Sequence, residues 1–173
     1  MKISISDRCK EHMEAHKADF IVEWTSLMRQ VREILLQETI QEEFIVRELN
    51  MGKAIGYEKL IKTKETDMIV YAKRLNRELY TRFVKGKTAT LTHTMVVILS
   101  QDRRNPHKYD LVTAYPGRIA YKEPEDPNIH TKQELRESLY FWQQHALIFD
   151  EANIDVATIR AACPYQYLYT SLE

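Results

Sequence analysis

The chain has little glycine and little cysteine, and neither sign of charge predominates. Its 173 residues include four glycines and two cysteines, with 25 Lys and Arg against 25 Asp and Glu. No Gly-rich phosphate loop is present, so nucleotide binding of that kind is excluded. Cys9 and Cys163 lie near opposite ends and form no Cys-x-x-Cys pair, which argues against a zinc site and a disulfide framework. We expect neither a metal nor another cofactor.

Long apolar runs are also missing. No segment approaches the length of a membrane span, and residues 1–10 lack the apolar core of a secretion signal. No Gly-x-Ser-x-Gly elbow or His-Glu-x-x-His helix is present. We therefore expect a soluble, cytoplasmic protein that has no membrane partner.

The N-terminal part is predicted to be helical. Residues 7–49 contain no Pro or Gly, and Phe20, Trp24, Leu27 and Val31 recur at the spacing of one helix face. Residues 42–49 are predicted to continue as a second helix after a bend. Such a stripe must be buried against the sheet, another helix or a second chain, so a protein partner or a homodimer through these helices stays open.

Short β-prone runs follow, and they give the predicted fold class. We expect an α+β protein with N-terminal helices, a small antiparallel meander and a C-terminal helix, divided into a helical segment, residues 1–52, and an α+β domain, residues 53–173. The last strand should place Tyr109, Leu111, Thr113 and Tyr115 on one face. The C-terminal helix begins at Thr131 with a capping-box pattern. The predicted strands are residues 57–64, 68–74, 90–99 and 108–115, with residues 79–84 as either a strand or a short helix.

Basic and hydroxyl side chains in the predicted sheet form the candidate site. Basic residues outnumber acidic ones between Lys53 and Lys87, which fits either a solvated surface or a face that binds a polyanion. Metal-free RNA cleavage needs a base, an acid, and cations or hydroxyls around the phosphate. Each side chain also has a structural interpretation, such as an ion pair for an arginine or a helix C-terminus for His145. The candidates are Lys73, Arg74, Arg77, Arg82, His93, Thr113, Tyr115 and His145.

Several of these segments together resemble a family of small, uncharacterised bacterial proteins. They are residues 68–77, 80–84, 94–99, 109–117 and 141–147. The hairpin followed by a Thr-x-Tyr-Pro strand is similar to the barnase, EndoU, colicin and RelE-like superfamily of metal-independent RNases, many of which are toxins.

The resemblance implies specific roles for the candidate residues. Thr113 and Tyr115 would lie near the phosphate, with Arg74, Arg77 and Arg82 behind them. His145 and His93 compete for the role of general base. On this basis His145, Arg74, Thr113 and Tyr115 are the expected catalytic residues, while Lys73, Arg77, Arg82 and His93 are expected to bind RNA.

Three functions therefore stay open. The first is a toxin-like, metal-independent endoribonuclease that cleaves RNA by attack of the 2′-OH and leaves a cyclic phosphate. The second is a non-catalytic interaction domain that binds a partner through its N-terminal helices. The third is a domain that binds a small anion through the arginine cluster.

Overall fold

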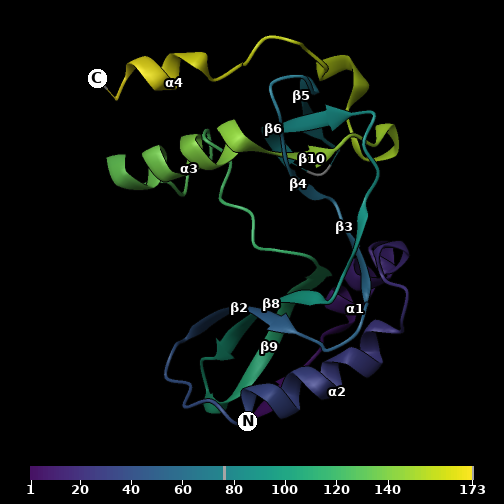
Figure 1. Cartoon of the computed structure of the whole chain (residues 1–173). Helices are drawn as coiled ribbons and strands as arrows, with labels where there is room; N and C mark the ends of the chain where they lie inside the picture. Colours follow the sequence, from purple (N-terminus) through teal and green to yellow (C-terminus); the bar gives the residue numbers. More distant parts are fainter. Residues whose placement is uncertain (76, 173) are drawn as a thin grey trace. The chain divides into compact units, whose positions relative to one another are not determined.

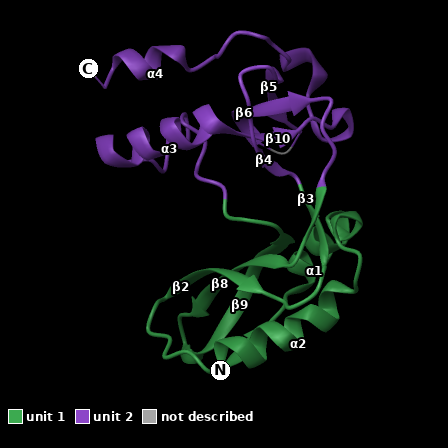
Figure 2. Ribbon diagram, viewed as in Figure 1, with its two compact units in different colours: residues 1–58, 90–119 green, residues 59–89, 120–173 purple. Residues whose placement is uncertain are grey.

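The protein consists of two compact units, and each is made from two stretches of the chain (Figures 1 and 2). The structure is a computed structural model that describes residues 1–75 and 77–172. Unit 1 comprises residues 1–58 and 90–119, and unit 2 comprises residues 59–89 and 120–173. This division differs from the predicted one, residues 1–52 and 53–173. The N-terminal segment needs residues 90–119 to complete its sheet.

Unit 1 is built on a mixed four-stranded sheet with the strand order β1-β9-β8-β2. β1 (Lys2–Ser4) runs parallel to β9 (Asn105–Pro116). β8 (Thr94–Asp102) is antiparallel to β9 and to β2 (Phe44–Asn50). A separate antiparallel pair and three helical segments complete the unit: β3 (Gly56–Glu58), β7 (Thr90–Thr92), α1 (Asp7–Ala15), η1 (Lys17–Asp19) and α2 (Trp24–Leu35).

The predicted burial of the apolar stripe is confirmed, and the stripe forms part of the core of unit 1, but Phe20 lies before α2, in an isolated β-bridge with Gly56, rather than on one continuous helix. Phe20, Trp24, Leu27 and Val31 are at most 9% exposed and pack with buried residues of the sheet such as Val97. The unit therefore covers this stripe with its own sheet. A partner or homodimer through these helices stays a prediction, and it would have to use other faces of them.

The prediction of a second helix at residues 42–49 is wrong, because Phe44–Asn50 is the edge strand β2. Ile45 and Leu49 are buried opposite Leu99 and Met95 of β8. The run is rich in β-branched and aromatic side chains, which favour a pleated surface next to another strand.

The predicted hairpin is confirmed, with a correction to its faces. β8 and β9 are adjacent antiparallel strands, although the predicted strand 90–99 is broken at His93 into β7 and β8. A β-bulge leaves Val112 without a partner, because Ile98 pairs with Thr113 and Leu99 pairs with Leu111. The extra residue reverses the alternation beyond it.

The bulge separates residues that we expected on one face. Tyr109 and Leu111 are buried in the core together with Ala114. Thr113 and Tyr115 pair with Ile98 and Val96 and point to the opposite face.

Unit 2 contains a second mixed sheet with the order β4-β10-β6-β5. β10 (His145–Ile148) is parallel to β6 (Arg77–Lys85) and antiparallel to β4 (Leu60–Lys62), and β5 (Met68–Arg74) is antiparallel to β6. Residues 79–84 are therefore strand rather than helix. The expected single antiparallel meander is replaced by two mixed four-stranded sheets. The helical segments of unit 2 are α3 (Lys132–Gln144), η2 (Glu151–Asn153), η3 (Val156–Thr158) and α4 (Gln166–Thr170).

Two local features of unit 2 position the candidate site. The predicted capping box is confirmed: Thr131 accepts a hydrogen bond from the Glu134 N–H, and the Glu134 carboxylate accepts one from the Thr131 N–H. After β10, the chain returns along the outer edge of β5, where Arg160 and Tyr71 exchange backbone hydrogen bonds of 2.9 and 2.8 Å. The C-terminal segment therefore adds a further strand-like row to this sheet. Within the described residues, no helix is long and apolar enough to cross a membrane.

Candidate functional site

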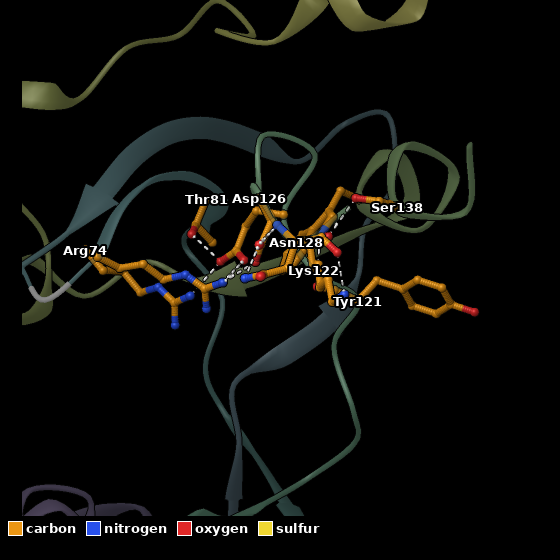
Figure 3. Close-up of polar contacts among 10 residues, drawn as sticks. Arg74, Thr81, Tyr121, Lys122, Asp126, Asn128 and Ser138 are labelled. Atoms are coloured by element: carbon orange, nitrogen blue, oxygen red, sulfur yellow. Dashed lines mark hydrogen bonds and ion pairs between the residues drawn. The ribbon is translucent and has the colours of Figure 1, made fainter. Parts of the chain in front are cut away.

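Arg74 and Arg77 are bound by two buried carboxylates of the segment that precedes α3 (Figure 3). Arg74 Nη2 lies 2.5 Å from Glu123 Oε1, and Arg77 Nη2 lies 3.0 Å from Glu123 Oε2 and 2.9 Å from Asp126 Oδ2. Thr81 donates a further hydrogen bond to Glu123. The carboxylates are 4% and 7% exposed, so they depend on these partners to offset their lost hydration.

The same segment is attached to α3 by polar contacts that Figure 3 also draws. The Lys122 carbonyl accepts hydrogen bonds from Ser138 Oγ at 2.6 Å and Trp142 Nε1 at 3.0 Å. Ser138 and Trp142 are buried. Arg74 and Arg77 therefore belong to a network that fixes this segment, which is the structural interpretation of these arginines.

His145 ends α3 and begins β10. Its ring stacks on Phe141 with centroids 4.3 Å apart, and Nδ1 lies 3.0 Å from the Phe141 carbonyl. Phe141 also stacks on Tyr121. One ring nitrogen and one ring face are thus engaged within the protein, as expected of a histidine at a helix C-terminus.

Thr113, Tyr115 and His93 belong to unit 1, whereas the other candidates belong to unit 2. Thr113 Oγ1 lies 3.0 Å from Nε2 of His12 on α1. His93 is exposed, and its carbonyl accepts a hydrogen bond from the Met51 N–H. The expected convergence of all the candidates on one surface stays a prediction.

His12 is paired with a second histidine of the same segment. The His12 and His16 rings meet edge to face at 4.7 Å. Burial and the neighbouring His16 lower the pKa of His12. No group of His, Cys, Asp and Glu side chains suited to a metal occurs among the described residues.

Lys73 and Arg82 lie on the face of the unit 2 sheet opposite Thr81. Strand alternation places Tyr80 and Arg82 on one face of β6 and Thr81 on the other. Across the strands, Tyr71 pairs with Arg82 and Lys73 pairs with Tyr80. A register shift after Lys73 then sets Arg74 opposite Arg77. The cations between Lys73 and Arg77 therefore lie in two environments. Lys73 lies on the same face as Arg82, whereas Arg74 and Arg77 bind the buried carboxylates.

Arg82 is held in place from the side of β4 and β10. Its Nη1 donates to Thr63 Oγ1 at 2.8 Å and to the His145 carbonyl at 3.0 Å. These neutral acceptors orient the guanidinium without neutralising its charge. Nε and Nη2 carry the remaining N–H donors of the fork.

A pocket of about 290 Å³ opens beside Arg82. The sheet contributes Arg82 and Tyr71, α3 contributes its exposed residue Gln143, and the C-terminal segment contributes the rest. The Tyr71 ring also meets the ring of buried Tyr165 edge to face at 5.6 Å. The lining residues are Tyr71, Arg82, Gln143, Cys163, Gln166 and Tyr169.

The ionisable side chains around Arg82 are held in their neutral forms. Burial raises the pKa of Tyr71 to about 12, and nearby Cys163 acts in the same direction whereas Arg82 opposes it. Burial also raises the pKa of the Cys163 thiol and of Tyr169. At neutral pH the pocket thus contains one fixed positive charge surrounded by uncharged hydroxyl, thiol and amide groups.

The sequence interpretation identified Arg82 but missed the rest of the pocket. Tyr71 and Gln143 were part of the resemblance without a role, and Cys163 was considered only for metal or disulfide chemistry. The polar and aromatic run at residues 163–169 was the available signal. Its distance in sequence from Arg82 concealed the connection.

The comparisons with known proteins bear on the fold alone. No protein-family pattern matches the chain, and no curated protein does. Among solved structures, it is similar to a conserved hypothetical protein from Toxoplasma gondii ME49. That similarity has a TM-score of 0.53 and 10% sequence identity, and it covers 77% of this chain and 89% of that chain. At this level of identity a shared fold does not imply a shared function.

Proposed function

We propose that unit 2 binds a small anionic group, a phosphate or a carboxylate, in the pocket beside Arg82. The observation that carries this proposal is that the three arginines differ in their ion-pair partners. Arg74 and Arg77 are paired with buried carboxylates, whereas no carboxylate within the described residues forms a salt bridge with Arg82. A partly buried guanidinium without a counter-ion gains most from an anion that brings one.

The other lining groups suit an anion as well. Tyr71 and Tyr169 keep their phenol protons at neutral pH, so their hydroxyls can donate hydrogen bonds. The Gln143 and Gln166 amides can donate too. No lining residue carries a negative charge, because the Cys163 thiol stays protonated. The planar fork of an arginine matches phosphate or carboxylate oxygens in pairs.

The size of the pocket limits what it can enclose. At about 290 Å³ it lies just below the range of roughly 300–1,000 Å³ for small-molecule sites. It can therefore surround one anionic group and its immediate substituent, but it cannot enclose a large ligand.

The test is a titration with inorganic phosphate and with acetate, followed by NMR of the backbone amides. We expect saturable shifts of the amides of residues 163 and 165–169 in the wild type. Because a hydrogen bond to a charged group contributes about 1.5–3 kcal/mol, Arg82→Gln should weaken binding roughly tenfold or more. Arg103→Gln, in the exposed turn between β8 and β9, removes the same charge and should bind like the wild type. Absence of shifts in the wild type, or equal affinity of Arg82→Gln, would contradict the proposal.

Ribonuclease activity, which the resemblance implies, stays a separate prediction. It requires a base and an acid at the phosphate in addition to cations. Incubating the protein with total RNA in EDTA and analysing the fragment ends tests it directly. Cyclic phosphate ends that are absent with Arg82→Gln would support it, and intact RNA would count against it.

A further inference from the structure

The Arg82 pocket lies at one end of a wider cationic row. Arg160 pairs with Tyr71, and Tyr71 pairs with Arg82, so these three residues stand side by side across three neighbouring segments. Paired residues in antiparallel segments point to the same face. With strands about 4.8 Å apart, the backbones of Arg160 and Arg82 are roughly 10 Å apart.

The two guanidinium groups contact different partners on this face. Arg160 lies over the Tyr80 ring, with Cζ 4.8 Å from the ring centroid. Arg82 instead bonds to Thr63 and the His145 carbonyl on the side of β4 and β10. Two positive centres on one face suit a ligand that carries several negative groups.

A third cation joins the row at Tyr80. Lys73 Nζ lies 5.5 Å from the centroid of the same ring. Its ion-pair partner Glu78 is 96% exposed at 3.3 Å, and such surface pairs are weak. Arg160 is exposed, and within residues 1–75 and 77–172 it has no salt bridge. Lys73 and Arg160 are therefore accessible to an external anion.

The adjoining helix presents an exposed aromatic ring. Arg136, Tyr140 and Gln143 recur at spacings of four and three residues on α3, which places them on one helix face. Gln143 lines the pocket, and Tyr140 is 68% exposed. An exposed ring beside a cationic surface is the arrangement that binds unpaired bases by stacking.

We propose that the ligand of this surface is single-stranded nucleic acid, an inference that rests on the anion pocket proposed above. One phosphate occupies the Arg82 pocket, neighbouring phosphates contact Arg160 and Lys73, and a base stacks on Tyr140. Besides Glu78, two other carboxylates lie close to this route: Glu125 acts electrostatically on Cys163, and the Asp155 backbone N–H donates to the Lys73 carbonyl. Glu125 accepts a hydrogen bond from Tyr167, and Asp155 caps η3, so both have partners of their own.

The test uses fluorescence anisotropy with a labelled 12-nucleotide oligouridylate, recorded over a range of salt concentrations in EDTA. Each cation that contacts a phosphate contributes about 0.7 to the slope of log affinity against log salt. Arg160→Gln and Lys73→Gln should therefore each reduce the slope by about 0.7 and weaken binding. Tyr140→Ala should weaken binding roughly fivefold or more. Arg103→Gln should leave affinity and slope unchanged.

The outcomes separate this inference from the proposed function. If phosphate binds in an Arg82-dependent way but the oligonucleotide binds no tighter, the nucleic-acid inference fails and the anion pocket stands. Two further results would overturn it. One is that a duplex or polyglutamate binds the wild type as tightly as the oligouridylate does. The other is that the Lys73, Arg160 and Tyr140 variants bind the oligouridylate as tightly as the wild type does. If phosphate and oligonucleotide both fail to bind, both proposals fall. Tyr140 and Arg160 are exposed and Lys73 is partly exposed, and equal melting temperatures will verify that the variants are folded.

Discussion

At the scale of single residues, surroundings decide the role of an arginine. Arg74, Arg77 and Arg82 lie on two paired strands, yet Glu123 and Asp126 neutralise the first two. Glu123 is 49 positions away in sequence from Arg74, and Asp126 is 49 positions away from Arg77. The sequence could indicate that each arginine needs a partner or a ligand. Which of the two applies is decided by the fold.

The arginine–carboxylate network gives the first prediction. Replacing Glu123 by Gln should lower the free energy of unfolding by roughly 3–5 kcal/mol, because two arginines lose a buried counter-charge. Arg74 Nε is already buried without a hydrogen-bond partner in the described structure, so the site has little capacity to compensate. Urea denaturation measures the change. Glu65→Gln, at an exposed turn, is the matched control and should shift stability by less than about 0.5 kcal/mol. Similar losses for both variants would contradict a structural role of the network.

The buried tyrosines of unit 2 give a prediction about pH. Burial raises the pKa of Tyr71 to about 12 and also raises the pKa of Tyr165 and Tyr169. The folded state therefore holds these protons more tightly than the unfolded chain, whose tyrosines titrate near pH 10. Stability should be unaffected by these groups below about pH 9 and should fall as pH rises from 10 through 12.

Denaturation midpoints at pH 9, 10 and 11, followed with tyrosinate absorbance, measure this effect. Tyr71→Phe should flatten the decline, because one of the perturbed phenols is gone. Tyr57→Phe is the control, since that ring is 41% exposed. A midpoint that stays constant up to pH 11 would show that the phenols titrate alike in both states.

At the scale of secondary structure, the spacing of apolar and capping residues predicted helices α2 and α3. A single bulge, by contrast, decided which residues of β9 face the core. Three- and four-residue spacing found the α2 stripe, and the Thr131 capping box marked the start of α3. One unpaired residue, Val112, reversed the expected faces of Thr113 and Tyr115. A bulge depends on the partner strand, so alternation within one strand cannot reveal it. For the same reason the sequence predicts a helix over residues 42–49, where the chain instead forms β2 beside β8.

The bulge gives a prediction that distinguishes two neighbouring deletions. Deleting Val112, which is 46% exposed, removes the extra residue and leaves Leu111 and Ala114 pointing inwards and Thr113 outwards. Unit 1 should therefore retain its fold and most of its stability. Deleting Ala114 must instead move either Thr113 or Tyr115 into the place of a fully buried alanine, which costs free energy through overpacking. Thermal melting and circular dichroism compare the two. Equal stability of the deletions would show that the bulge does not set the faces.

At the scale of the whole molecule, the chain passes between the two units at residues 58–59, 89–90 and 119–120 (Figure 2). Sequence patterns could not predict this division, because no Pro- or Gly-rich linker marks the crossings. The α+β class was predictable from the alternating runs. The order of strands within each sheet was not, because β1 and β10 each pair with strands far away in sequence. The candidate pocket shares this property, since its lining comes from residues 71–82 and 143–169.

Each unit has its own apolar core, and this gives the last prediction. The core of unit 1 includes Leu27 and Val97, and the core of unit 2 includes Val70 and Phe83. Leu27→Ala should cost roughly 2–5 kcal/mol and Phe83→Ala roughly 3–5 kcal/mol, because both side chains are nearly fully buried. If the cores are separate, each loss should be local.

Native-state hydrogen exchange measures this locality. Leu27→Ala should accelerate exchange in α2, β8 and β9 while the amides of β5 and β6 keep their protection, and Phe83→Ala should do the reverse. Binding of phosphate to unit 2 should accordingly survive Leu27→Ala at temperatures where unit 1 has begun to open. Uniform acceleration in both units by either substitution would mean that the three crossings unite them into one cooperative structure. The Arg82 pocket would then depend on the helices of unit 1 for its stability.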